Sequence, residues 1–180
     1  MNLEEVIKNC KKKNREAQAI LYNNYKDSLY SLSLKYCTNK EEAQDNLQDT
    51  FLYIFQNIKS YKNKGSFEGW MKRIAINKAI DRYKKSIQMA PIENYSFKNE
   101  DVFIENINEI PLSIILKFIQ KLPNQYRLVF NLYELDNFSH NDISNMLTIS
   151  VGTSKSNLFR AKKILKGNIQ QYITQTKVHG

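Results

Sequence analysis

The segment FSHNDISNMLTISVGTSKSNLFRAKKILK, residues 138–166, has the pattern of two short helices joined by a tight turn. Ser139 can cap a first helix at 140–146, in which apolar residues recur at steps of three and four. The turn follows at 148–150, and Ser150 can cap the second helix. This arrangement is typical of a helix-turn-helix whose second helix enters the major groove of DNA.

The second of these helices separates apolar positions from polar ones. Its inward side is expected to hold Val151, Leu158, Ala161, Ile164 and Leu165. The positions left to point elsewhere are Lys155, Ser156, Phe159, Arg160, Lys162 and Lys163. This outer face favours DNA binding, and a helical hairpin with a merely solvated outer face is the alternative from this segment alone.

The rest of the chain bounds the class of protein. Its 180 residues suffice for one ordinary domain or two small ones. No apolar run approaches the ~20 residues of a membrane span, and the charged N-terminal segment lacks the apolar core of a signal peptide. We therefore expect a cytoplasmic protein without membrane insertion. Cys10 and Cys37 form no CxxC pair and glycine is scarce, so no disulfide, metal or cofactor is expected.

The net charge of +9 is unevenly distributed along the chain. Residues 59–85 carry nine basic side chains against two acidic ones, and residues 110–180 carry nine against three. Between them, residues 86–109 carry one basic side chain against five acidic ones. Two basic blocks separated by an acidic strip indicate two separate contacts with nucleic acid.

Two further amphipathic helices precede the acidic strip. The helix expected at 41–58 has an apolar stripe formed by Ala43, Leu47, Phe51, Ile54, Phe55 and Ile58. Off this stripe lie Asp45, Gln48, Asp49, Leu52 and Gln56, a set that would usually be only a solvated face. Ser66 can cap the next helix, 66–85, which is expected to turn Phe67, Trp70, Met71, Ile74, Ala75, Ala79, Ile80 and Tyr83 inward.

A loop at 60–65 introduces the second of these helices. The loop and the start of the helix combine aromatic with basic residues: Tyr61, Lys62, Lys64 and Phe67. The outer side of the helix holds Lys72, Arg73, Asn77, Asp81, Arg82 and Lys84. Stacking faces beside positive charge suit single-stranded DNA. The alternative is that core aromatics happen to neighbour surface lysines.

The chain is expected to be all-α, with two small helical domains. Pro91 breaks the helical pattern where the chain turns acidic, which predicts a linker. We assign residues 1–88 to the first domain, 89–110 to the linker and 111–180 to the second, helix-turn-helix domain. In the latter, helices are expected to begin after Pro111 and Pro123, and Asn137 can end the second of them in a left-handed conformation.

Three segments resemble bacterial RNA polymerase sigma factors of the small, two-domain extracytoplasmic-function type. EEAQDNLQDTFLYIF is similar to the core-polymerase-binding helix, and FEGWMKRIAINKAIDRYKK to the helix for the minus-ten promoter element. The segment from Leu122 to Leu165 resembles the domain that binds the minus-thirty-five element. All three occur in the family's order and spacing, over most of residues 16–170.

The resemblance implies partners and roles. Core RNA polymerase would be bound by Asp45, Gln48, Asp49 and Leu52. The minus-ten element, melted to single strands, would be bound by Tyr61, Lys62, Lys64, Phe67, Lys72, Arg73 and Asn77. The double-stranded minus-thirty-five element would be bound by Thr153, Lys155, Ser156, Phe159 and Arg160. The resemblance also implies an inhibitory anti-sigma partner and no catalysis by the chain itself.

Some positions depart from the family's pattern. Asn157 stands where many relatives carry arginine, which lowers the expected attraction to phosphate. Thr148 and Asn137 stand where glycine is frequent. The main alternative function is a stand-alone helix-turn-helix regulator, and a DNA enzyme lacks a plausible nucleophile or acid–base group. No dimer face is evident, so the free protein is expected to be a monomer.

Overall fold

The computed structural model describes residues 2–87 and 110–178, and within these ranges it contains helices and connecting turns but no β-strand. The expectation of an all-α fold is confirmed. Contacts divide the chain into two compact units, Met1–Arg82 and Tyr83–Gly180, and each is described by itself. Every helix in the described part of the chain is too short or too polar to cross a lipid bilayer.

The domain limits 1–88, 89–110 and 111–180 stay predictions. Apart from Ile110, which is buried, the expected linker lies outside the described residues.

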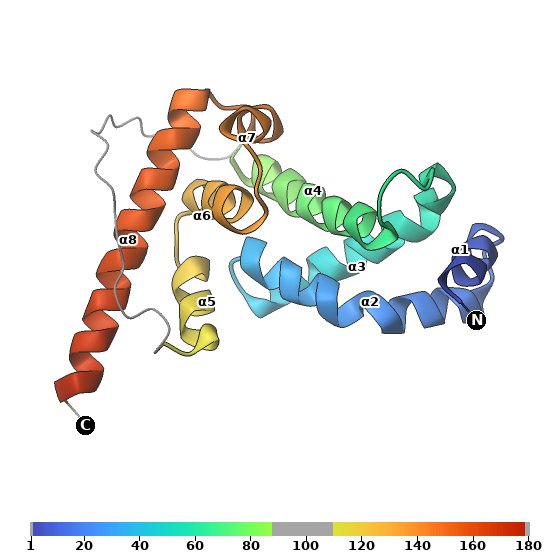
Figure 1. The fold of residues 1–180 in the computed structure, drawn as a ribbon, viewed down its shortest axis with the longest axis horizontal. Helices are drawn as coiled ribbons and strands as arrows, with labels where there is room; N and C mark the ends of the chain where they lie inside the picture. The colour runs from blue at the N-terminus through green and yellow to red at the C-terminus, as the bar shows by residue number, and fades with distance from the viewer. Residues whose placement is uncertain (1, 88–109, 179–180) are drawn as a thin grey trace. The chain divides into compact units, whose positions relative to one another are not determined.

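The first unit comprises α1 (Leu3–Lys11), α2 (Arg15–Tyr36), α3 (Lys40–Asn57), the short 3₁₀-helix η1 (Ile58–Ser60) and α4 (Phe67–Ile87) as far as Arg82. Figure 1 shows α2, α3 and α4 running side by side, and α1 packs against α2 and η1. A side-chain oxygen accepts a backbone N–H at the start of each α-helix; the four capping residues are Asn2, Asn14, Asn39 and Ser66.

Helix α1 is not among the helices expected from the sequence. A capping box marks its start, because Asn2 and Glu5 each accept the other's backbone N–H. The helix then buries Val6, Ile7 and Cys10. The spacing of Asn2 and Glu5 ahead of apolar residues is the local signal that could have predicted it.

The core of the first unit contains one polar bridge. The apolar stripe of α3 is buried as expected, except that Phe55 is only half-buried. Within this core, Asn46 is fully buried and donates from Nδ2 to Ser33 Oγ on α2 (3.0 Å) and to the Ala75 carbonyl on α4 (3.2 Å). Its Oδ1 has no hydrogen-bond partner among the described residues. Asn46 therefore links three helices while leaving one buried acceptor unsatisfied.

Replacing Asn46 by leucine is expected to destabilise the first unit by ~1–2 kcal/mol, because two buried acceptors, Ser33 Oγ and the Ala75 carbonyl, lose their donor. Ser33 keeps its own bond to the Leu29 carbonyl, so the loss at Ser33 is limited to the bond that its oxygen accepts from Asn46. The measurement is a urea titration followed by fluorescence of Trp70, the only tryptophan in the chain. As a control, Asn46→Asp should destabilise the unit by burying a charge. An equal or higher midpoint for Asn46→Leu would contradict the prediction.

The second unit comprises α5 (Leu112–Gln120), α6 (Asn124–Phe130), the π-helical turn η3 (Asn131–Leu135), α7 (His140–Leu147) and α8 (Val151–Val178). Helices α5, α6 and α7 each pack against the long α8 (Figure 1). Ile119, Leu122, Ala161 and Leu165 form a buried cluster between α5 and α8. The expected inward position of Ile164 is wrong: its side chain is 37% exposed, because α8 turns Ala161 and Leu165 to the cluster instead.

The turns of the helix-turn-helix have left-handed backbone positions. Ser139 caps α7 in a capping box with Asp142, and Ser150 Oγ accepts the N–H of Thr153 in α8, so both expected caps are confirmed. Asn137 has φ of 56°, as expected, and Thr148 has φ of 58°. A β-branched residue in this region is strained, so the turn between α7 and α8 is held in place against a local cost.

Candidate docking and nucleic-acid interfaces

The four residues expected to bind a partner protein lie together on α3. Asp45, Gln48, Asp49 and Leu52 are all exposed, and their spacing of three, four and seven residues puts them on one side of the helix. Leu52 is 59% exposed, an apolar side chain beside two carboxylates. We call these four residues the docking face. They combine negative charge, an amide and an apolar contact, which suits a basic protein surface with an apolar pocket.

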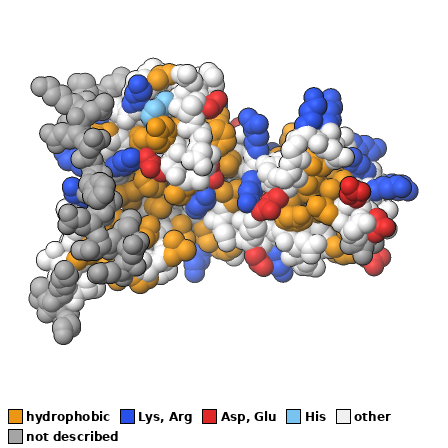
Figure 2. All heavy atoms as spheres, in the orientation of Figure 1, with side chains coloured by type: hydrophobic (Ala, Val, Ile, Leu, Met, Phe, Trp, Pro, Cys, Tyr) orange, Lys and Arg blue, Asp and Glu red, His pale blue; other side chains and the backbone are white. Residues whose placement is uncertain are grey.

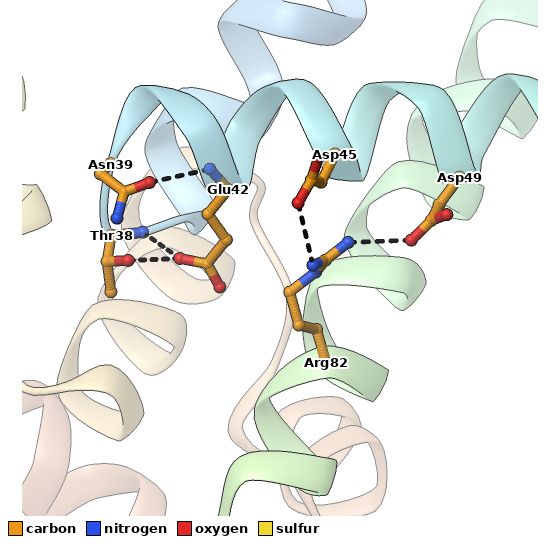
Figure 3. A network of polar contacts seen from close by, with 6 residues as sticks. All are labelled: Thr38, Asn39, Glu42, Asp45, Asp49 and Arg82. Atoms are coloured by element: carbon orange, nitrogen blue, oxygen red, sulfur yellow. Dashed lines mark hydrogen bonds and ion pairs between the residues drawn. The ribbon is translucent and has the colours of Figure 1, made fainter.

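An arginine from another helix engages both carboxylates of the docking face. Arg82 of α4 donates from Nη2 to Asp49 Oδ2 at 2.8 Å, and its Nη1 lies 3.8 Å from Asp45 Oδ2 (Figure 3). From the sequence, Arg82 was expected only on the outer side of its helix. The pairing joins residues 33 positions apart, so no local spacing could have predicted it.

The loop before α4 is built around buried aromatic rings. Tyr61 is 8% exposed and Phe67 3%, with ring centroids 4.9 Å apart, and Trp70 lies 5.5 Å from each. The Tyr61 hydroxyl donates to the carbonyl of Gly65 at 2.9 Å, closing the loop. Tyr61 and Phe67 are therefore core aromatics that neighbour surface lysines, which is the alternative considered from the sequence. Their contact with a DNA base stays a prediction, and their burial counts against direct stacking.

Three basic residues and one asparagine around this loop and on α4 are accessible. Lys62, Lys64, Arg73 and Asn77 are exposed, and lysine and arginine side chains project from the edge of the first unit that carries the loop (Figure 2). We call these four residues the basic face. The backbone of the loop at 60–65 has left-handed positions at Asn63 and Gly65, with φ of 56° and 87°.

Lys72 differs from the residues of the basic face because it is paired. Its Nζ lies 2.7 Å from Glu68 Oε1, which also accepts a hydrogen bond from Ser28 Oγ at 3.3 Å. The hydrogen bond and charge of Lys72 hold the pKa of Glu68 below its usual value. The positive charge of Lys72 is thus partly offset within α4, so we expect it to contribute less to nucleic-acid attraction than Arg73.

The first three turns of α8 contain the residues expected to face a DNA groove. Lys155 is exposed, while Thr153, Ser156 and Phe159 are half-buried. Thr153 Oγ1 lies 2.8 Å from Ser150 Oγ, and the Ser156 hydroxyl donates to the Thr153 carbonyl at 3.0 Å. Each hydroxyl oxygen keeps accepting capacity. The capping contacts therefore fix these side chains relative to the helix start.

Arg160 and Asn157 are turned toward α6. Arg160 donates from Nη1 to the Tyr126 hydroxyl at 3.1 Å, and its guanidinium lies 5.8 Å from the centroid of that ring. Asn157 is buried and donates to Gln125 Oε1 at 3.0 Å. The lower phosphate attraction expected from asparagine at position 157 stays a prediction, and the structure adds that this side chain packs inside the unit. The bond to Tyr126 uses one of the five guanidinium N–H groups of Arg160.

His140 is a structural residue that the sequence did not single out. Its ring stacks on Tyr133, with centroids 4.3 Å apart and planes 20° apart, and its Nδ1 lies 2.8 Å from the buried Ser154 Oγ. It thereby connects α7 to η3 and α8. Burial, and secondarily the positive charge of Lys155, lowers the pKa of His140 below its ordinary value of 6.5.

Acidification is expected to destabilise the second unit through His140. Because the pKa is lower in the folded chain, the unfolded chain binds more protons, so stability is retained above pH 6.5 and lost as the pH falls below it. The measurement is the urea midpoint of the native chain and of His140→Gln at several pH values from about 7.5 to about 5. This range spans the ordinary histidine pKa, and the difference between the two midpoints should change across it. Parallel pH profiles for the two proteins would contradict the assignment to His140.

Comparisons with known proteins match both units. The Sigma-70 region 2 family model matches residues 21–86, and the Sigma-70 region 4 model matches residues 112–165. The ECF RNA polymerase sigma factor SigW of Bacillus subtilis is 31% identical, over 94% of this chain and 98% of its own length. The ECF RNA polymerase sigma-E factor of Escherichia coli is 26% identical, over 93% of this chain and 94% of its own.

Solved structures with a similar fold include two proteins that were solved in complexes. The sigma factor RpoE of Bartonella quintana, with the anti-sigma factor NepR, is 18% identical with a TM-score of 0.54, covering 84% of this chain and 96% of its own. CnrH, in complex with the cytosolic domain of CnrY, is 18% identical with a TM-score of 0.50, covering 92% and 96%. At this identity the likeness concerns the fold alone.

Proposed function

Because the chain belongs to the extracytoplasmic-function sigma factors of RNA polymerase, we propose that it binds core polymerase, directs it to specific promoters and assists their melting. The observation that carries the proposal is the docking face of α3, where Asp45, Gln48, Asp49 and Leu52 lie exposed together. A stand-alone DNA-binding regulator would leave this face without a role. The chain itself performs no covalent chemistry in this proposal.

The minus-ten element is assigned to the basic face and α4. Lys62 and Lys64 attract the backbone of the non-template strand, while Arg73 and Asn77 contact the upstream part of the element. Extruding a base costs a few kcal/mol, so a loop of fixed shape is needed to hold it. We assign Tyr61 and Phe67 to support of that loop, since both are buried beneath it.

The minus-thirty-five element is assigned to the start of α8. Lys155 and Ser156 face the groove, Phe159 offers an apolar contact, and Thr153 contacts a phosphate. Arg160 is placed at the edge of this surface, where its bond to Tyr126 orients the guanidinium. We propose that Arg160 contacts a guanine edge or a phosphate there.

An anti-sigma factor is the remaining partner we propose. RpoE was solved with the anti-sigma factor NepR, and CnrH with the cytosolic domain of CnrY. The same fold supports a comparable inhibitor here. We place the protein in the cytoplasm, where core polymerase acts, as a monomer when free.

Run-off transcription with purified core polymerase from a related host tests the proposal. Core polymerase alone should give no specific transcript, and addition of this protein should start transcription at defined sites. Variants of the basic face, such as Arg73→Ala, should bind core polymerase normally but reduce open-complex formation. If the protein binds promoter DNA tightly alone and never confers initiation on core polymerase, the proposal is wrong and the stand-alone regulator replaces it.

A further inference from the structure

The docking face places two negative charges one helical turn apart. Asp45 and Asp49 are four residues apart on α3, with side chains that are 65% and 54% exposed. Like charges at this spacing destabilise a helix and favour side-chain conformations that move them apart. A surface that needs both carboxylates aimed in one direction therefore needs something to hold them.

Glu42, an acidic residue at the start of α3, is held in a different way. Glu42 accepts hydrogen bonds from the backbone N–H of Thr38 (2.7 Å) and from its hydroxyl, while its own N–H donates to Asn39 Oδ1 (Figure 3). Glu42 is thus committed to ordering the helix start. The two aspartates have no comparable link to the backbone of α3 in the contacts described, and their restraint comes from α4.

Arg82 lies between the two carboxylates and behind them. Its side chain is 32% exposed, less than either aspartate, so the two carboxylates stay more accessible to solvent than the guanidinium that pairs with them. Both contacts use Oδ2, and a carboxylate can accept about four hydrogen bonds. Oδ1 of Asp45 and of Asp49 therefore keeps capacity for an incoming partner while Arg82 stays in place.

We propose that Arg82 is a positioning residue for core-polymerase docking, holding Asp45 and Asp49 in the orientation that a basic surface of the polymerase accepts. The inference rests on the proposed function and concerns how its docking face is prepared. Restraining side chains before binding removes an entropic cost that would otherwise be met on association. The same contact links the docking face to α4, which carries Arg73 and Asn77.

Equilibrium titration of the fluorescently labelled full-length chain with purified core polymerase tests this role. Arg82→Gln should weaken binding by about 3- to 10-fold, the effect of freeing one or two side chains. Arg82→Lys should recover part of the affinity, because one ammonium can pair with one carboxylate but lacks the planar fork. Lys85→Gln, which removes one exposed positive charge from the same helix, should stay within about twofold of the native chain.

A double-mutant cycle separates positioning from direct contact. In an Asp49→Asn background, where the 2.8 Å contact is weakened, Arg82→Gln should change affinity by less than about twofold. The Trp70 unfolding midpoint should be nearly unchanged by Arg82→Gln, since exposed ion pairs add little stability. A shifted midpoint that accounts for the loss of affinity would assign Arg82 a structural role.

Two results overturn the inference outright. Equal or tighter binding by Arg82→Gln would make Arg82 a competitor of the polymerase, and an undiminished loss in the Asp49→Asn background would make it a direct contact. Neither result affects the proposed function, which instead fails if the native chain does not bind core polymerase at all.

Discussion

Replacement of Arg127 by methionine is expected to destabilise the second unit by about 2–3 kcal/mol, the cost of leaving one buried and one part-buried carbonyl without their charged donor. Arg127 is 3% exposed, and its Nη1 donates to the carbonyls of Gln120 and Leu122, both at 3.0 Å. Its Nη2 donates to Asn124 Oδ1 at 2.7 Å. One side chain therefore satisfies carbonyls at the end of α5 and orders the start of α6.

The position of Trp70 allows the two units to be followed separately. Trp70 packs with Tyr61 and Phe67 in the first unit, so its fluorescence reports that unit, while far-UV circular dichroism reports the helices of both. In a urea titration, Arg127→Met should shift the part of the dichroism change that comes from the second unit. The fluorescence midpoint should stay where it is in the native chain.

The lysine variant gives the matched control. Arg127→Lys keeps the charge but cannot reach three acceptors with a planar fork, so it should lose a smaller part of the stability. A dichroism curve unchanged by Arg127→Met would show that the two carbonyls find other donors. A shift of the Trp70 midpoint by the same amount would show that the units do not unfold independently.

The helices of this chain are largely predictable because their signals are local. Asn39, Ser66, Ser139 and Ser150 each precede an apolar periodicity, and each accepts a backbone N–H at a helix start. A side-chain cap acts within three residues, so sequence spacing is enough to find it. The N-terminal helix α1 carried the same kind of signal and could have been predicted from it.

The sequence predicts which site residues share one face of a helix, but not which residues of other helices they contact. The spacing of residues 45–52 placed four residues on one side of α3, where the structure has them. Arg82 and Arg160 were both expected on outer faces, yet each is bound to a side chain from another helix. Periodicity says which way a residue leaves its own helix, whereas the partner is set by how helices pack.

Two aromatic residues, Tyr61 and Phe67, show the same limit of prediction from sequence spacing. Tyr61 and Phe67 flank exposed lysines in sequence, which suggested rings facing nucleic acid. Phe67 also belongs to the apolar spacing of α4, and burial in the core stabilises an aromatic ring far more than exposure to solvent does. The loop turns at Asn63 and Gly65 so that both rings enter the core while Lys62 and Lys64 remain outside.

Charge reversal at Asp49 is expected to have the largest effect on function, lowering affinity for core polymerase by at least ~100-fold, about 3 kcal/mol. Asp49→Lys removes the 2.8 Å ion pair with Arg82 and puts a second positive charge beside it. It also opposes the basic surface that the docking face is proposed to meet, where like charges cost several kcal/mol. Transcription from a cognate promoter should be lost in parallel.

Loss of folding would not explain this result, because Asp49 is half-exposed and surface ion pairs contribute little to stability. The Trp70 unfolding midpoint of Asp49→Lys should confirm an intact first unit. The matched control is Asp27→Lys, the same charge reversal at an exposed position on α2, which should bind core polymerase within a few-fold of the native chain. Asp49→Asn should fall between the native chain and Asp49→Lys, because it removes the attraction without adding repulsion. Equal binding by Asp49→Lys and Asp27→Lys would place the polymerase contact away from α3.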